Sequence, residues 1–203
     1  MTINQIAETV HENAVRHGFW DAPVSDELAI ALIHSEWSEA LEELRAGRPM
    51  VYGLILDGSN DATPCLTEDA AEIRARGLKP EGVAVELIDG CIRILDLFGA
   101  KGWMVRNNAD DAPSTLESLY EDEDVRAETS IDAAHLIARL HMATSEALKE
   151  LQKGDEREAM YCLMVAICDA MSWIDARGLD PMALLALKHD YNVTRPIRHG
   201  KRF

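Results

Sequence analysis

The sequence predicts an all-α protein built from two related halves, and three observations carry this prediction. Apolar residues recur at the three- and four-residue intervals of amphipathic helices through most of the chain. Segments with the alternating pattern of a half-buried β-strand are almost absent. A segment of the first half, ALIHSEWSEALEELRAG at 31–47, aligns without gaps on ARLHMATSEALKELQKG at 138–154. We interpret this similarity as an internal duplication.

Three helices are expected in the first half. Their apolar positions are Ile3, Ile6, Ala7 and Val10 in the first, Leu28, Leu32, Ile33, Ala40, Leu41 and Leu44 in the second, and most of 83–98 in the third. Ser25 or Asp26 can cap the second helix and Gly47 can end it. The connection at 51–79 is long, contains a short helical pattern at 67–77, and suits an up-and-over helical bundle.

The second half is expected to be helical as well. Residues 107–129 are acidic and poor in aliphatic side chains, which is typical of a linker. Helical patterns follow at about 130–152, 155–176 and 181–190, and a basic tail ends the chain. The predicted organisation is therefore a first half at 1–106, a linker at 107–129 and a second half at 130–203.

Composition narrows the possible partners. The formal net charge of −16 opposes binding to nucleic acid, which requires clustered Lys and Arg. The four cysteines show no CxxC spacing, so neither a zinc site nor a disulfide framework is indicated. No apolar run is long enough to cross a bilayer and no secretory leader is recognisable, so we expect a soluble, cytoplasmic protein without a membrane partner. A phosphorylated substrate would need cations at its binding site.

Two pairs of carboxylates are the strongest candidate site. Glu36 and Glu39 lie three residues apart on the second helix, and Glu86 and Asp89 repeat this spacing on the third. Each pair therefore shares one helix face. On facing helices the four carboxylates would surround one cavity and suit Mg²⁺, or Mn²⁺ in its place. Arg93, one turn after Asp89, is expected either to reach a phosphate or to pair with Asp89.

Four blocks of the chain resemble the MazG-like all-α nucleoside triphosphate pyrophosphatases. They are HENAVRHGFW, LIHSEWSEALEELRAG, KPEGVAVELIDGCIRILDLFGAKG and KHDYNVTRPIRHGKRF, which occur in the order of the family. The resemblance implies a helical bundle and Mg²⁺-dependent hydrolysis of a nucleoside triphosphate, or its deoxy form, to the monophosphate and pyrophosphate. It makes Glu36, Glu39, Glu86 and Asp89 the metal-binding and catalytic residues.

The resemblance also assigns substrate contacts to the basic end of the chain. The implied residues are Lys188, Tyr191, Asn192, Arg195, Arg198 and Lys201, and Arg93 is a further candidate because of its position one turn after Asp89. Lys and Arg would meet phosphates, and Tyr or Asn would meet the sugar or base. A loose, solubilising terminus is the alternative interpretation. Trp20 and Trp37 are candidates for stacking on a base, although packing in the core is the favoured role.

The second half departs from the family pattern. Glu146 and Glu150 match Glu39 and Glu43, but Ala143 stands where the first half has Glu36. Because the family assembles as dimers, we expect a fused pseudo-dimer with a degenerate second half. Whether two such chains also associate as a homodimer is left open by the sequence.

The alternative functions are a nucleotide-binding regulator without turnover and a purely structural helical protein. The preferred base and sugar cannot be read from the sequence.

Overall fold

The computed structural model describes residues 1–55, 63–65, 67–105, 115–116, 118 and 130–197. The helices are α1 (Ile3–Arg16), α2 (Asp26–Arg45), α3 (Ala70–Ala75), α4 (Val83–Lys101), α6 (Ala133–Lys153), α7 (Glu156–Asp175) and α8 (Pro181–Thr194). The strands are β1 (Tyr52–Ile55), β2 (Thr63–Cys65) and β3 (Lys79–Glu81). The described part of the chain is thus mostly helical, as predicted. The predicted linker at 107–129 lies almost entirely outside the described residues.

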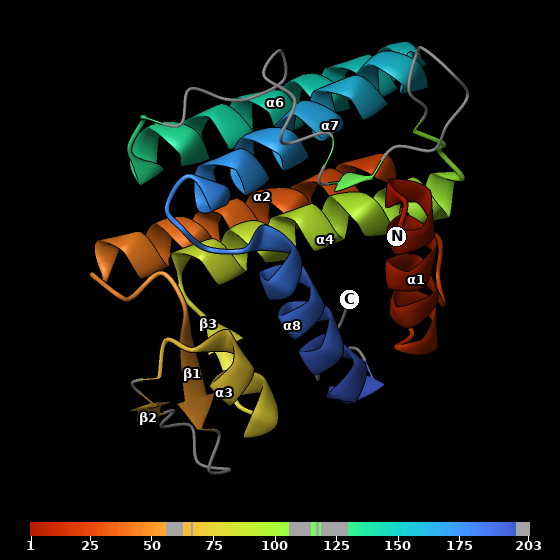
Figure 1. Ribbon diagram of the computed structural model, residues 1–203. Helices are drawn as coiled ribbons and strands as arrows, with labels where there is room; N and C mark the ends of the chain where they lie inside the picture. The colour runs from red at the N-terminus through yellow and green to blue at the C-terminus, as the bar shows by residue number, and fades with distance from the viewer. Residues whose placement is uncertain (56–62, 66, 106–114, 117, 119–129, 198–203) are drawn as a thin grey trace.

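The body of the molecule is formed by the helices of 19 to 21 residues, which are α2, α4, α6 and α7 (Figure 1). Helix α2 packs on α4, α6 packs on α7, and the two pairs meet through contacts of α2 with α6 and of α4 with α7. Helices α1 and α8 both pack on α4 at the side away from α6 (Figure 1). Helix α4 is therefore the centre of the fold, and its nearly continuous apolar sequence is buried on most sides.

The two copies of the internal repeat lie against each other at equivalent positions. His34 of α2 and His141 of α6 occupy the same place in the alignment, and their rings stack with centroids 5.0 Å apart. Three residues later, the indole N–H of Trp37 donates to the hydroxyl of Thr144 at 2.9 Å. Trp37 is completely buried. Its role is therefore packing between the halves, and it is not available to stack on a nucleobase.

A close approach of α2 to α4 depends on Gly90. A Cβ at this position would lie 2.1 Å from the ring of Trp37, which is itself held by Thr144. We expect Gly90→Ala to lower the free energy of unfolding by about 1–3 kcal/mol, because the core has no room to repack. Urea denaturation measures this loss. In a Trp37→Phe variant the same substitution should cost less stability. An unchanged urea midpoint for Gly90→Ala in the protein that keeps Trp37 would contradict this packing.

The stacked histidines should make stability depend on pH. The Nδ1 atoms of His34 and His141 lie 2.8 Å apart, so one ring donates and the other accepts a single proton. Burial lowers the pKa of both imidazoles below the ordinary 6.5, and the nearby charge of His141 lowers the pKa of His34 further. Below about pH 6.5 the two imidazoles take up protons in the unfolded chain and not in the folded chain, so the contribution of this pair destabilises the fold on acidification.

The measurement is the urea midpoint as the pH falls from about 7.5 to about 5.5, which spans the unfolded histidine pKa. The double replacement His34→Gln and His141→Gln should flatten this decrease. Burial also lowers the pKa of His189, but it raises the pKa of the Glu36 and Glu86 carboxyls, which favours the fold as the pH falls, so the test is the difference in slope between the two proteins. An equal slope in the two proteins would show that the stacked pair does not carry the effect.

Between α2 and α4 the chain forms a small sheet that the sequence pattern did not reveal. Its strand order is β2-β1-β3, and both pairings are antiparallel. Helix α3 falls within the helical pattern expected at 67–77. Arg74 of α3 forms an ion pair with Asp190 of α8, and the carbonyl of Pro80 accepts from the Lys188 ammonium at 3.3 Å. The sheet is therefore fastened to α8, at the side of the bundle where the carboxylates lie.

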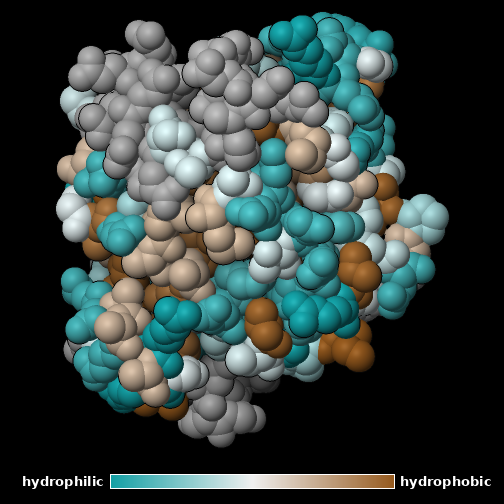
Figure 2. Space-filling view, turned by 45° about the vertical axis from the view of Figure 1, so that its right-hand side comes forward, coloured by the Kyte–Doolittle hydropathy of each residue, from teal (hydrophilic) through white to brown (hydrophobic). Residues whose placement is uncertain are grey.

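No helix among the described residues is both long and apolar enough to cross a membrane. Hydrophilic residues cover much of the face shown in Figure 2, and the most hydrophobic residues are scattered between them. This surface agrees with the strongly acidic composition.

Candidate metal centre

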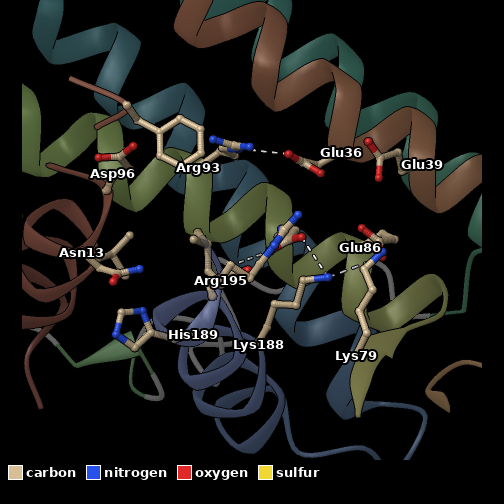
Figure 3. Close-up of a pocket in the computed structure, with 16 residues that line it drawn as sticks. Asn13, Glu36, Glu39, Lys79, Glu86, Arg93, Asp96, Lys188, His189 and Arg195 are labelled. Atoms are coloured by element: carbon tan, nitrogen blue, oxygen red, sulfur yellow. Dashed lines mark hydrogen bonds and ion pairs between the residues drawn. The ribbon is translucent and has the colours of Figure 1, made fainter. Parts of the chain in front are cut away.

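The four predicted carboxylates line one cavity of about 170 Å³ (Figure 3). Glu36 and Glu39 reach it from α2, and Glu86 and Asp89 reach it from α4. Glu36, Glu86 and Asp89 each present one oxygen within 4.8 Å of the others, close enough to ligate a single ion. Glu39 lines the same cavity but is exposed and stands outside this trio. Packing of α2 on α4 is what brings the two pairs together.

The chain makes a tight turn at Gly82 immediately before α4. Gly82 precedes the helix with a φ of 114°, and a Cβ there would lie 2.6 Å from the carbonyl oxygens of Pro49 and Met50. A non-glycine residue would therefore strain the backbone and meet main-chain atoms. The carbonyl of Gly82 accepts from the amide of Glu86 at 3.0 Å. The turn thus fixes where the first carboxylate of α4 stands.

Burial makes this cluster electrostatically costly. Only 5% of Glu36 and 2% of Glu86 is exposed. Burial raises the pKa of the Glu36 carboxyl, and the charge of Asp89 raises it further, against the opposing charge of Arg93. Burial likewise raises the pKa of the Glu86 carboxyl, while the Lys188 ammonium opposes the rise. Ionised carboxylates at this depth require compensating cations.

Two cationic side chains supply part of the compensation. Lys188 of α8 is 2% exposed, and its Nζ lies 2.9 Å from Asp89 Oδ2 and 3.6 Å from Glu86 Oε1. Burial alone would lower the pKa of Lys188, but the charges of Asp89 and Glu86 raise it above its usual range. Arg93 Nε donates to Glu36 Oε1 at 2.9 Å. Of the two alternatives for Arg93, the ion pair with Asp89 on its own helix is not formed, since its partner is Glu36 on α2, and the contact with a phosphate stays a prediction.

The donor set fits a hard divalent ion. Three carboxylates from two rigid helices offer oxygen ligands, which Mg²⁺ and Mn²⁺ prefer, and the cavity leaves room for water or substrate oxygens. Two buried amide oxygens among the described residues, Asn13 Oδ1 and Asn192 Oδ1, also have no hydrogen-bond donor although both residues line the cavity. Buried acceptors normally have a partner, so these two oxygens are available to the donor groups of a bound molecule or water.

The predicted substrate residues separate into three groups. Arg93, Lys188, Asn192 and Arg195 line the cavity with the carboxylates. Tyr191 does not line it, although its ring centroid lies 5.9 Å from the guanidinium of Arg195, which does. Arg198 and Lys201 lie outside the described residues. Within the described residues, the basic end of the chain contributes to the cavity through α8 and Arg195, which follows it.

Several lining residues escaped prediction from the sequence. Lys79 of β3 and His189 of α8 lie on the cavity wall. Asp96 also lines it, accepting from the Trp20 indole at 3.0 Å and contacting His11 Nδ1 at 2.7 Å. A signal for Asp96 was available, because it follows Glu86, Asp89 and Arg93 at helical spacing on one face of α4.

A second, mainly apolar cavity of about 130 Å³ adjoins the first. Phe19, Arg93 and Asp96 line both cavities. The remaining wall comes from the loop after α1 and from the start of α2: Gly18, Trp20, Ala22, Pro23, Val24, Leu28, Ala29 and Leu32, with Leu97 of α4. A flat, largely apolar group joined to a charged one would fill the two cavities together.

The second half lacks a comparable centre in its described part. Glu146 forms an ion pair with Lys149, and Glu150 forms one with Lys153. Asp169 of α7, which aligns with Arg93, is 3% exposed and pairs with Arg139 of α6 at 2.9 Å. Among the described residues, the only group of three candidate metal ligands is Glu36, Glu86 and Asp89. These three carboxylates of the second half therefore serve as partners of Lys and Arg.

Glu43, the further carboxylate of α2, has a structural contact of its own. It accepts from the Tyr52 hydroxyl at 2.9 Å and so joins α2 to β1. It does not line the cavity of the other carboxylates.

Comparison of the chain with protein-family models, with curated proteins and with solved structures found no match.

Proposed function

We propose that the chain is a magnesium-dependent nucleoside triphosphate pyrophosphohydrolase of the MazG-like kind. The observation that carries this proposal is the cavity in which carboxylates of α2 and α4 meet cations of α4, α8 and β3. Buried carboxylates suit a divalent ion, and interleaved cations suit phosphates. In a chain with a net charge of −16, this cavity provides the local positive groups that a polyphosphate needs.

The neighbouring apolar cavity supports a nucleotide over an inorganic phosphate as substrate. It opens beside Phe19 and Asp96, which also line the charged cavity. We place the nucleobase there and the phosphates between α2, α4 and α8. The amide oxygens Asn13 Oδ1 and Asn192 Oδ1, which accept no hydrogen bond from the described residues, are available to sugar hydroxyls or base N–H groups. The lining favours no particular base.

In the proposed reaction, water attacks the α-phosphorus and the bond from that phosphorus to the α,β-bridging oxygen breaks. The products are the nucleoside monophosphate and pyrophosphate. Glu36, Glu86 and Asp89 would hold the metal, which supplies charge neutralisation and acidifies bound water. Glu39 is exposed beside this trio, and we assign to it the acceptance of the water proton. Lys188 and Arg195 would stabilise charge on the phosphate oxygens.

We also propose that the fold is an internal pseudo-dimer. Two contacts support it: His34 on His141, and Trp37 on Thr144, each between equivalent positions of the repeat. Equivalent residues of two copies meet where a two-fold axis passes between them. Among the described residues the carboxylate trio is present in the first half only, as expected if one of two duplicated sites was kept. Helix α8 follows the second copy, and its Lys188 contacts Asp89 in the site of the first copy.

A nucleotide-binding regulator without turnover is the second candidate. The observation that favours it is that Lys188 and Arg93 already pair with Asp89 and Glu36, so the cluster is partly neutral without a metal. Such a protein would bind nucleotides and still release no pyrophosphate.

The test is a product analysis over a panel of ribo- and deoxyribonucleoside triphosphates, in Mg²⁺ and in EDTA. The proposal expects monophosphate and pyrophosphate from at least one nucleotide, and only with the metal. Nucleotide binding without products would favour the regulator. Release of orthophosphate and a nucleoside diphosphate would contradict the assigned point of cleavage.

A further inference from the structure

The segment inserted between α2 and α4 places one cationic side chain, Lys79, on the wall of the cavity. Lys79 stands in β3, which pairs with the central strand β1 at Leu54. Its side chain is 30% exposed and forms an ion pair with Glu81. It also lines the cavity of the carboxylates. The side chain of Lys79 is 30% exposed, against 3% for Lys188, so its ammonium can reach a further partner while the buried Glu81 stays paired with it.

Lys79 lies at one particular end of the cavity. Its partner Glu81 ends β3, and α4, with Glu86 in its first turn, begins two residues later. Figure 3 shows Lys79 with Glu86 at one side and Asp96 at the opposite side. Ten residues of helix separate Glu86 from Asp96, which corresponds to about 15 Å along α4. The apolar cavity adjoins the Asp96 end.

This order along α4 gives the substrate a direction. A nucleoside triphosphate with its base beside Asp96 and its α-phosphate at the carboxylate trio must extend its outer phosphates toward Glu86 and beyond. We propose that Lys79 binds the β- and γ-phosphates and so makes the site selective for triphosphates. The proposal rests on the function proposed above and adds a subsite supplied by the inserted sheet.

Two attachments position this subsite. The carbonyl of Pro80, next to Lys79, accepts from Lys188 Nζ, the ammonium that also contacts Asp89. Arg74 of α3 pairs with Asp190 of α8. The backbone that carries Lys79 is therefore tied to the helix that carries the other phosphate-binding groups. Glu81 holds Lys79 while the subsite is empty, and the terminal phosphates join Glu81 as partners of the same ammonium when substrate binds.

The experiment measures binding of pyrophosphate and of the nucleoside monophosphates, each with Mg²⁺, by calorimetry on the full chain. Lys79→Met should weaken pyrophosphate binding about tenfold to a hundredfold, since one charge-assisted contact is lost. Monophosphate binding should not change. Lys79→Arg should restore most of the pyrophosphate affinity. Lys101→Met is the matched control, because Lys101 is also partly buried and ion-paired but lies outside the cavity.

The outcomes separate this inference from the proposed function. Wild-type turnover together with undiminished pyrophosphate binding by Lys79→Met would overturn the subsite and leave the function standing. An equal loss of pyrophosphate and monophosphate binding would also overturn it, because the lysine would then act on the site as a whole. Absence of both turnover and pyrophosphate binding in the wild type would remove the function and the subsite together.

Discussion

Asp89→Asn is expected to abolish the stabilisation of the fold by millimolar Mg²⁺ and to reduce turnover by about a hundredfold or more. Asp89 is one of the three residues whose oxygens converge within 4.8 Å, so its loss leaves two ligands. The first measurement is the melting temperature in Mg²⁺ and in EDTA. A metal that binds only the folded chain raises this temperature. The second is the rate of pyrophosphate release.

Asp169→Asn provides the matched control. Asp169 is a buried aspartate of α7 that pairs with Arg139, and no candidate metal group within the described ranges includes it. This variant should lose stability and still respond to Mg²⁺ as the wild type does. If Asp89→Asn retained the full response to Mg²⁺, the assignment of the metal to the first half would be wrong.

Lys188→Met should cost about 3–5 kcal/mol of stability in EDTA, the usual range for breaking a buried ion pair. The ammonium lies 2.9 Å from Asp89 Oδ2 and is almost completely enclosed, so its removal leaves uncompensated carboxylates. Mg²⁺ should restore much of this loss, because the metal brings positive charge to the same oxygens. Turnover should stay low, since the phosphates lose their own contact. Chemical denaturation with and without Mg²⁺ measures the two effects.

Arg139→Met tests whether this rescue is specific. It removes the cationic partner of buried Asp169 in the second half, where the described residues form no carboxylate trio. Its loss of stability should be the same in Mg²⁺ and in EDTA. Equal rescue of both variants would mean that Mg²⁺ acts through the general acidity of the chain, and not through the cavity.

Much of the fold was predictable because local patterns determine it. The three-residue spacings of Glu36 with Glu39 and of Glu86 with Asp89 place each pair on one face, and an otherwise apolar α4 turns its pair inward. The prediction that Ser25 caps α2 is confirmed, since its hydroxyl accepts from the amide of Leu28. The small sheet was missed because strands of three and four residues are too short to display an alternating pattern.

Partners across helices were the least predictable part of the site. Arg93 could be placed one turn from Asp89, but its ion pair with Glu36 depends on the separation of α2 and α4, which Gly90 and Trp37 set. Lys79 belongs to a loop whose path becomes fixed only when β3 pairs with β1. Sequence spacing gives neighbours within a helix, while contacts between elements require the packing itself.

The central claim is that the metal site of the first half hydrolyses nucleoside triphosphates to the monophosphate and pyrophosphate. The most direct test is to measure pyrophosphate release in Mg²⁺ by the wild type, Glu39→Gln and Glu146→Gln. The two glutamates are equivalent in the repeat, but only Glu39 lines the cavity, while Glu146 pairs with Lys149. The account predicts metal-dependent release that Glu39→Gln abolishes and Glu146→Gln leaves unchanged. Release that is equally impaired in both variants, or no release from any nucleotide, would contradict it.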